Sequence, residues 1–227
     1  IARSGRPGPV LIDITKDAQF ATADFEYKPC VSVRSYNPIP VVNQSEVDAA
    51  AAIILNAEKP LIVWGQGVIL GKAEEEFKSF VEKGNIPAAW TILGVSALPT
   101  SHPLNVGMVG MHGNYGPNVL TNECDVLIAI GMRFDDRVTG RLDGYAKQAK
   151  VIHLEIDPAE VNKNVAADVA VLGDVKQTLP MLTQKIASKP YTEWFEKFKA
   201  HDKIEFDTVI NKDLNPTKDC LLYTSPS

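Results

Sequence analysis

Apolar runs and amphipathic segments alternate along the middle of this chain, and the alternation predicts its fold. Five runs are apolar almost throughout, which is typical of strands buried on both faces of a parallel sheet. They are Leu61–Trp64, Ile86–Thr91, Asp125–Ile130, Val151–Ile156 and Ala167–Leu172. Because segments with helical character separate most of these runs, we predict an α/β fold with a doubly wound, mostly parallel sheet.

The first two helices are predicted from their apolar faces and from the residues that begin or end them. Ser45, with Asp48 three residues later, is expected to cap the first helix. One apolar face follows, formed by Val47, Ala50, Ala51, Ile54 and Leu55. The second helix is predicted over Lys72–Lys83, with Gly84 as the residue just beyond its end.

Further helices are predicted after the later strands. Asp157 and Pro158 are expected to begin one helix. Gly173 and Asp174 open another, which runs through Ile186. Its buried face consists of Val175, Leu179, Leu182 and Ile186. Near the C-terminal end, the apolar residues Trp194, Phe195 and Phe198 indicate a short amphipathic helix at most.

The two ends of the chain lack the alternation, so we divide the sequence into five parts. These parts are residues 1–20, 21–44, 45–187, 188–219 and 220–227. The first holds Val10–Ile14, a predicted strand without a partner here, and the prolines of the second are typical of a linker. Residues 45–187 form the predicted α/β domain, followed by another linker. The last eight residues are interpreted as foreign sequence, and the start at Ile1 indicates a fragment.

Composition narrows the possible functions. The chain has 227 residues and a net charge of −5, and no basic patch indicates nucleic-acid binding. Its apolar runs are shorter than the ~18 residues that a membrane span needs. No signal-peptide pattern is present. The three cysteines, Cys30, Cys124 and Cys220, lack metal-binding spacing, which favours a reducing, cytoplasmic setting.

Two loops that flank the run Asp125–Ile130 are the strongest candidates for a ligand site. The first carries glycine at every third position and is expected to form neither helix nor strand. Its glycines are Gly107, Gly110, Gly113 and Gly116. Pro117 is predicted to begin a helix behind them, which favours anion binding. The second loop, Met132–Arg137, is charged and follows the strand directly. Taken alone, each loop is better explained as an ordinary glycine turn or a solvated charge cluster. Because both loops flank one buried strand, together they favour a nucleotide-type site.

Weaker signals lie at other strand ends. Gly65, Gly67 and Gly71 form a pattern one residue longer than G-x-G-x-x-G, which fits a dinucleotide site or a plain strand-to-helix turn. Asp157 could hold a ribose hydroxyl or cap a helix, and Glu155 could hold the ribose instead. His102, alone in a loop, is expected to be a surface residue.

Three stretches of sequence resemble one known family. GMHGNYGPN at residues 110–118 and IGMRFDDRVTG at residues 130–140 resemble the central domain of the acetolactate synthase (acetohydroxyacid synthase) family, within the thiamine-diphosphate enzymes. SGRPGPVLIDITKD at residues 4–17 resembles the end of the preceding, pyrimidine-binding domain. The resemblance covers nearly all of residues 1–219. It implies a Rossmann-like central domain, with residues 188–219 leading toward a third domain.

The resemblance also implies that the central domain binds FAD in a structural role. The implied flavin contacts are Arg6, Gly65, Gln66, Gly67, Thr91, Ile92, Leu93, Val109, Gly110, Met111, His112, Gly131, Met132, Arg133, Asp135, Arg137, Val138, Glu155, Ile156, Asp174 and Val175. Acid–base chemistry by His112 is an alternative, although the sequence gives it no carboxylate partner at fixed spacing. The resemblance implies that His112 packs against the cofactor, and we follow that assignment.

The implied reaction decarboxylates pyruvate and transfers the two-carbon unit to a second 2-ketoacid. The resemblance assigns substrate binding to Arg137, Met111 and Asp136, with Arg137 receiving the acceptor carboxylate. A surface arginine paired with Asp136 is the alternative. Thiamine diphosphate and Mg²⁺ would bind outside this chain, and the catalytic residues would also lie outside it. We further expect a homodimer or homotetramer and possible attachment of a regulatory subunit. The alternatives are a glyoxylate carboligase or pyruvate oxidase type of enzyme and a non-catalytic nucleotide-binding module.

Overall fold

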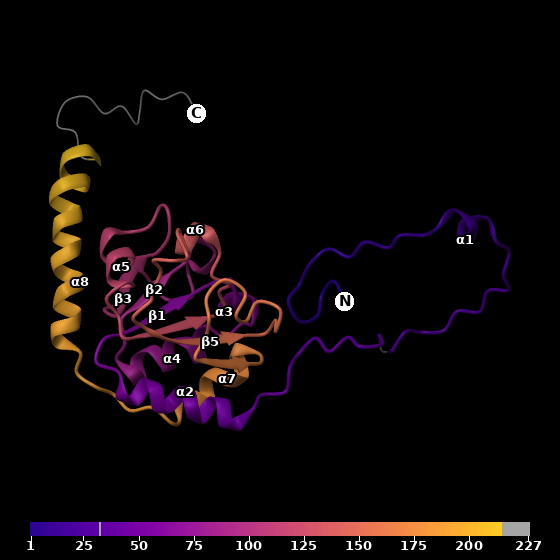
Figure 1. Ribbon diagram of the computed structural model, residues 1–227, viewed down its shortest axis with the longest axis horizontal. Helices are drawn as coiled ribbons and strands as arrows, with labels where there is room; N and C mark the ends of the chain where they lie inside the picture. Colours follow the sequence, from indigo (N-terminus) through magenta and orange to yellow (C-terminus); the bar gives the residue numbers. More distant parts are fainter. Residues whose placement is uncertain (32, 215–227) are drawn as a thin grey trace.

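The computed structural model describes residues 1–31 and 33–214, and its centre is a parallel sheet (Figure 1). Within this described part, six strands pair in the order β3-β2-β1-β4-β5-β6, and every pair is parallel. The strands are β1 (Pro60–Trp64), β2 (Ala88–Trp90), β3 (Asn105–Met108), β4 (Val126–Ile130), β5 (Lys150–Glu155) and β6 (Val169–Leu172). The predicted fold class is confirmed.

The two central strands, β1 and β4, form the core. All five residues of each strand are buried, as the continuous apolar runs predict. Trp64 packs against Phe77, with ring centroids 4.9 Å apart, and both side chains are fully buried. Burial of one such large apolar side chain contributes roughly 1.5–3 kcal/mol to stability.

Helices cover both faces of the sheet. In Figure 1, α2 (Gln44–Asn56), α4 (Glu74–Gly84) and α7 (Val175–Thr183) lie below the sheet. The short helices α5 (Tyr115–Leu120) and α6 (Asp136–Thr139) lie above it. The other short elements are α1 (Lys16–Phe20), α3 (Gln66–Leu70) and the 3₁₀ turn η1 (Ile92–Gly94). This doubly wound arrangement leaves the carboxyl ends of the strands open along one edge.

The ends of α2 and α4 differ from the prediction. Asn43 caps α2 in place of Ser45, because its side-chain oxygen accepts a hydrogen bond from the Ser45 amide at 3.0 Å. Leu55 lies outside the buried face and is 43% exposed. At the other helix, Gly84 is the last helical residue, and Asn85 adopts the left-handed conformation (φ 51°) that the prediction gave to glycine.

The predicted helix at Asp157–Pro158 is absent from the described chain, where turns follow β5 instead. Asp157 Oδ1 accepts from the Ala159 amide at 3.0 Å, which closes a local turn. Asn162 has a positive φ of 59°, which a continuing helix cannot contain. The helix α7 does follow Asp174, which caps it, but it ends at Thr183. Its predicted buried face is confirmed at Val175, Leu179, Leu182 and Ile186, although Ile186 lies beyond the helix end.

The glycine-rich stretch was expected to form neither helix nor strand, and that prediction is wrong at both ends. Gly107 belongs to β3, where its φ of 104° suits an irregular edge strand. Gly116 is the second residue of α5, so Pro117 is the third helical residue and does not begin the helix. The missing N–H of Pro117 is still harmless there, because the first four amides of a helix have no partner within it.

The ends of the chain also differ from the prediction. Val10–Ile14 forms no strand among the described residues and is exposed, as is most of the extended N-terminal segment drawn to the right in Figure 1. At the other end, α8 (Thr192–Glu205) is a 14-residue helix, longer than predicted, that continues as a π-helical segment, Phe206–Leu214. Trp194 anchors α8 to the core, since its Nε1 donates to the Pro60 carbonyl at 2.9 Å. Residues 220–227, interpreted as foreign, lie outside the described residues.

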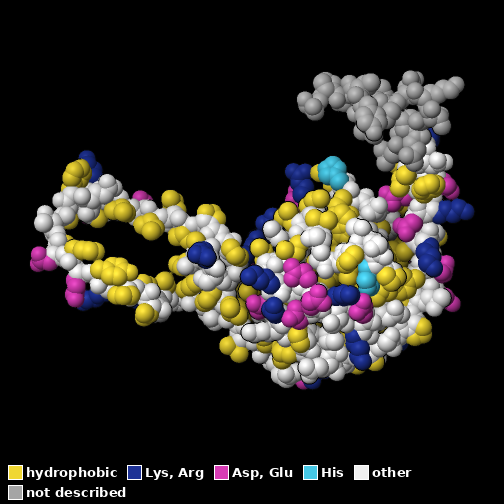
Figure 2. All heavy atoms as spheres, turned by 180° about the vertical axis from the view of Figure 1, so that it is seen from behind, with side chains coloured by type: hydrophobic (Ala, Val, Ile, Leu, Met, Phe, Trp, Pro, Cys, Tyr) yellow, Lys and Arg dark blue, Asp and Glu magenta, His cyan; other side chains and the backbone are white. Residues whose placement is uncertain are grey.

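Surface charge is mixed. On the face shown in Figure 2, acidic and basic side chains are interspersed over the folded domain, while apolar side chains line much of the extended N-terminal segment. No helix in the described chain is long and apolar enough to cross a bilayer.

Candidate functional site

The loops at the carboxyl edge of the sheet carry nearly all the residues predicted to bind a cofactor. Because all six described strands run parallel, their carboxyl ends meet at one edge. The predicted residues follow β1 (Gly65, Gln66, Gly67), β2 (Thr91, Ile92, Leu93), β3 (Val109, Gly110, Met111, His112), β4 (Gly131, Met132, Arg133, Asp135, Arg137, Val138), β5 (with Glu155 at its end, then Ile156) and β6 (Asp174, Val175). The fold therefore gathers segments that lie far apart in the sequence.

The centre of this edge is the switch point between β1 and β4, where the order of the strands reverses. The loops after these strands touch directly: the Gly67 amide donates to the Gly131 carbonyl at 3.0 Å. A Cβ on Gly67 would lie 2.6 Å from the Gly131 Cα, and Gly131 has a positive φ of 57°. The family resemblance implies that both glycines contact FAD. The structure gives a second reason for them, which is the close approach of the two loops to each other.

A neighbouring contact joins the glycine-rich loop to the charged loop. The Asn118 side chain accepts from the Gly110 amide at 2.8 Å and donates to the Gly110 carbonyl at 3.0 Å. The Met111 amide then donates to the Arg137 carbonyl at 2.8 Å. Sequence reasoning missed Asn118, because nothing in the sequence ties it to a glycine eight residues earlier. The contact places Met111 beside Arg137, two of the three residues predicted to bind substrate.

A cavity of about 310 Å³ opens between these two loops. It is lined by Val109, Gly110, Met111, Asn118, Thr121, Asn122, Asp136, Arg137, Val138, Thr139, Gly140 and Tyr145. All three residues predicted to bind substrate are in this lining. One lining residue is Tyr145, whose hydroxyl is buried and has no hydrogen-bond partner among the described residues. Burial raises the pKa of Tyr145, so the phenol stays protonated and can donate.

Arg137 and Arg133 lie close in the sequence but have different partners. Arg133 Nη2 forms an ion pair with Asp135 Oδ2 at 2.9 Å. The guanidinium of Arg137 has only the Met111 sulfur near it, 3.9 Å from Nη1, and within the described part of the chain no carboxylate pairs with it. The alternative in which Asp136 pairs with Arg137 is therefore wrong for this structure. Arg137 keeps its planar set of donors available.

Glu155 ends β5 and is buried at the same edge. Its Oε1 accepts from the amides of Ile156 at 3.0 Å and Asp157 at 3.2 Å. Burial nevertheless raises the pKa of Glu155. Behind it, His153 Nε2 lies 2.8 Å from the Met132 carbonyl, so this nitrogen carries the proton and donates. Burial lowers the pKa of His153, which keeps the ring neutral at pH 7.

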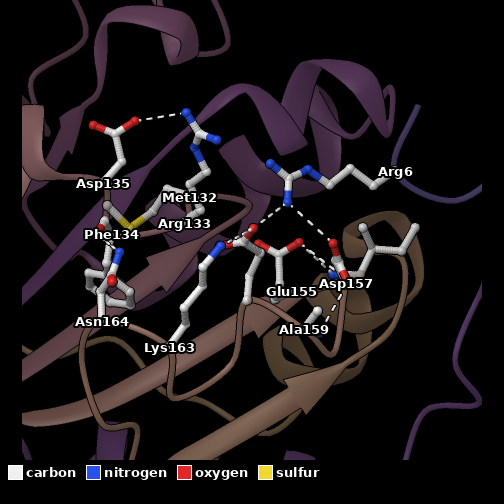
Figure 3. A network of polar contacts seen from close by, with 12 residues as sticks. Arg6, Met132, Arg133, Phe134, Asp135, Glu155, Asp157, Ala159, Lys163 and Asn164 are labelled. Carbon is white, nitrogen blue, oxygen red and sulfur yellow. Dashed lines mark hydrogen bonds and ion pairs between the residues drawn. The ribbon is translucent and has the colours of Figure 1, made fainter. Parts of the chain in front are cut away.

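Arg6, from the N-terminal segment, also contacts the turn after β5 (Figure 3). Arg6 Nη1 lies 3.2 Å from Asp157 Oδ2 and 2.6 Å from Glu160 Oε1. Lys163 Nζ lies 3.2 Å from the same Glu160 oxygen. Asp157 was predicted to cap a helix or bind ribose, and here it closes a turn and pairs with Arg6. Glu160 was not predicted, because no local pattern marks a partner 154 residues from Arg6.

Comparison with known proteins matches this chain to one family. The family model described as "Thiamine pyrophosphate enzyme, central domain" matches residues 47–182, more than half of the chain. The chain belongs to that family.

Relatives of this thiamine pyrophosphate enzyme domain carry consistent names. It is 44% identical to the "Probable acetolactate synthase large subunit" of Methanocaldococcus jannaschii, over 96% of this chain and 38% of that protein. It is 40% identical to the "Acetolactate synthase large subunit" of Corynebacterium glutamicum, over 88% of this chain and 33% of that protein. It is 36% identical to the "Acetolactate synthase isozyme 3 large subunit" of Escherichia coli, over 93% of this chain and 39% of that protein. The chain thus spans between 33% and 39% of the length of these relatives.

The carboxyl edge of this thiamine pyrophosphate enzyme domain has the chemistry that a flavin dinucleotide requires. Ile92, Leu93 and Met111 are 64%, 58% and 61% exposed there, which offers apolar surface to a flat ring. Arg6 has the guanidinium that would suit a phosphate, and Glu155 has the carboxylate that would suit a ribose hydroxyl. The residues present therefore fit the cofactor implied by the resemblance.

The described histidines lie in different surroundings. His112 is exposed and has no hydrogen-bond partner among the described residues, and its packing against the cofactor stays a prediction. His102 lies away in a loop, where its Nε2 is 3.2 Å from Glu82 Oε1 and its Nδ1 accepts from the Leu104 amide. Within the described residues, no group of three or more His, Cys, Asp or Glu side chains could hold a metal ion.

Proposed function

We propose that this chain is the FAD-binding central part of the catalytic, or large, subunit of an acetolactate synthase. The observation that carries the proposal is that residues implied to contact FAD, although scattered from residue 65 to residue 175, lie together along one edge of the sheet. The names of the relatives support the same assignment.

The whole protein would decarboxylate pyruvate and add the two-carbon unit to a second 2-ketoacid, a reaction of branched-chain amino-acid biosynthesis. Thiamine diphosphate supplies the electron sink for this chemistry when bound. It and its Mg²⁺ would be held by segments outside this chain. We therefore assign no catalytic residue to residues 1–227.

The residues of this chain would bind and orient. Arg137 receives the carboxylate of the acceptor ketoacid, because its guanidinium has no carboxylate partner among the described residues and its planar donors match a carboxylate. Met111 supplies an apolar wall beside Arg137, and Asp136 completes the charged rim of the cavity. This arrangement excludes water from one side of the acceptor while holding its charged end.

FAD would lie along the carboxyl edge in a structural role. Arg6 would bind its phosphates, and Glu155 its ribose. The touching loops at Gly67 and Gly131 allow the cofactor to approach the backbone at the switch point, and Ile92 and Leu93 would cover its rings. Asp174, at the start of α7, lies at the same edge.

The intact enzyme is expected to be a cytoplasmic homodimer or homotetramer, with a regulatory subunit as a possible partner. The "large subunit" in the names of the relatives favours such a partner. Another FAD-carrying thiamine-diphosphate enzyme, of the glyoxylate carboligase or pyruvate oxidase type, is the second candidate, because the same edge would serve any of these enzymes. A non-catalytic nucleotide-binding module is the third.

The test is to express the full-length protein from its complete coding sequence. We expect flavin released by acid to absorb as FAD, and acetolactate to form from pyruvate when thiamine diphosphate and Mg²⁺ are present. Residues 1–227 alone should give no acetolactate with the same additions. Purified protein that carries NAD or no nucleotide would refute the flavin site. Flavin without acetolactate would favour the second candidate, and turnover by residues 1–227 would show that the catalytic groups are misplaced.

A further inference from the structure

Arg6 is held at the carboxyl edge by a single one of its nitrogens. Nη1 makes both of its ion pairs, with Asp157 and with Glu160, and Figure 3 shows these contacts meeting at the end of the side chain. A guanidinium has five N–H donors, of which Nη1 carries two. The three donors on Nε and Nη2 have no partner among the described residues. The side chain is thus fixed while most of its donors stay available.

Glu160 is the stronger of the two anchors. Its contact with Arg6 is shorter, 2.6 Å against 3.2 Å, and its side chain is 7% exposed against 28% for Asp157. Solvent screens the contact with Glu160 less than the contact with Asp157, because the Glu160 carboxylate is the more buried of the two, although Arg6 itself is 38% exposed. Asp157 is also committed to the turn through its Oδ1.

Glu160 is itself held in place and charged. Its amide donates to the Asp157 carbonyl at 3.1 Å, and its carboxylate accepts from Lys163. Burial opposes ionisation of this carboxyl, but hydrogen bonds from Arg6 and Lys163 outweigh it and lower the pKa of Glu160. The carboxylate is therefore ionised at pH 7, and these contacts hold it in one position in the turn after β5.

We propose that Glu160 is a positioning residue, which holds Arg6 by Nη1 so that Nε and Nη2 are presented to a phosphate of the bound dinucleotide. The inference rests on the proposed function, because it assumes that FAD occupies this edge. Glu160 does not touch the cofactor. Arg6 has a long side chain and comes from an exposed, extended segment. Glu160 restricts the conformations of this side chain before FAD binds, so that less conformational entropy is lost on binding.

The experiment uses the full-length protein, stripped of flavin and titrated with FAD by fluorescence quenching. Glu160→Gln keeps the size of the side chain and removes its charge, and we expect it to raise the Kd for FAD about ten-fold, the scale of one charge-assisted hydrogen bond. The matched control is Glu123→Gln. Glu123 forms an ion pair of the same 2.6 Å length with Lys197, away from the carboxyl edge, and its substitution should leave the Kd within about two-fold.

A double-mutant cycle separates positioning from a general structural role. If Glu160 acts through Arg6, Glu160→Gln should have little further effect on the Kd in an Arg6→Gln background. A merely structural role would lower the melting temperature of the flavin-free protein and weaken binding equally in both backgrounds. If Glu160→Gln does not fold, Glu160→Asp, which keeps the charge but shortens its reach, enters the same cycle with the same expectation.

The outcomes of this cycle are distinct. A wild-type protein that binds no FAD overturns both the proposed function and the inference. A wild-type protein that binds FAD, together with a Glu160→Gln Kd equal to that of Glu123→Gln, overturns the inference alone. Equal effects of Glu160→Gln with and without Arg6 also overturn it. A ten-fold effect that vanishes in the Arg6→Gln background supports it.

Discussion

Gly67 and Gly116 offer a sharp test of the contact between loops at the switch point. Each is the second residue of a short helix, Gly67 in α3 and Gly116 in α5, and neither has a positive φ. By helix propensity alone, alanine at either position would stabilise the fold by up to ~1 kcal/mol. Their surroundings differ. A Cβ on Gly67 would meet the backbone of Gly131 at 2.6 Å, whereas a Cβ on Gly116 would lie 3.3 Å from the His201 side chain.

The expected magnitudes follow from these distances. Backbone at 2.6 Å cannot move aside as a side chain can, so Gly67→Ala must separate the loops after β1 and β4, and overpacking of this kind costs about 1–3 kcal/mol. After the gain in helix propensity, we expect a net loss of about 1–2 kcal/mol. Gly116→Ala needs a shift of a few tenths of an ångström at His201, and we expect a change between 0 and ~1 kcal/mol in the stabilising direction.

The assay is urea unfolding of the 227-residue chain, followed by the fluorescence of the buried residues Trp64 and Trp194. With a slope of roughly 2 kcal/mol per molar urea, the two variants should have midpoints separated by about 1 M. The Gly67→Ala midpoint should be the lower one. Equal midpoints, or a higher one for Gly67→Ala, would refute the argument that the loop contact requires glycine.

Three further predictions concern the cavity and the carboxyl edge. In the full-length enzyme, Arg137→Lys should weaken use of the acceptor ketoacid by about 1–3 kcal/mol in acceptor-competition assays. The control Arg133→Lys should not, because that guanidinium is already paired with Asp135. Unchanged competition with a loss of bound FAD would assign Arg137 to the flavin instead. Tyr145→Phe removes a buried hydroxyl that has no partner in the described chain, so the urea midpoint of the chain should stay the same or rise by the equivalent of up to ~1 kcal/mol, and a fall would reveal a partner. Burial raises the pKa of Glu155 above its ordinary 4.5, so the stability that Glu155 itself contributes should decrease as the pH rises from about 4.5 through its folded pKa; the difference in free energy of unfolding between the wild type and Glu155→Gln should therefore change over this range, and a difference that does not vary with pH would contradict the assignment.

The sequence predicted the parts of the fold that depend on local pattern. Each of the five apolar runs overlaps a strand, and β1 and β4 are buried throughout, whereas most of β6 is half-buried. The period of α7 placed Val175, Leu179 and Leu182 in the core. Where the prediction failed, an interaction that the local pattern does not contain determined the structure. Asn43 displaced Ser45 as a cap through one side-chain hydrogen bond, and Val10–Ile14 forms no strand because no partner strand reaches it within the described chain. A strand needs a neighbour, and no pattern within five residues can provide one.

The candidate site shows the same division between local and distant signals. The loops that follow strands are recognisable in the sequence, and parallel strands place them at a common edge. The individual contact residues came from the family resemblance and stay predictions. Residues that hold those loops in place are not recognisable in this way. Asn118 fixes Gly110 from within the next helix, and Glu160 fixes Arg6 across 154 positions of sequence. Such partners become visible only when the fold brings them together. At Glu160 and Asn118 the structure therefore adds most to what the sequence predicts. Each contacts a residue of the predicted site, Arg6 or Gly110, without being predicted as part of that site.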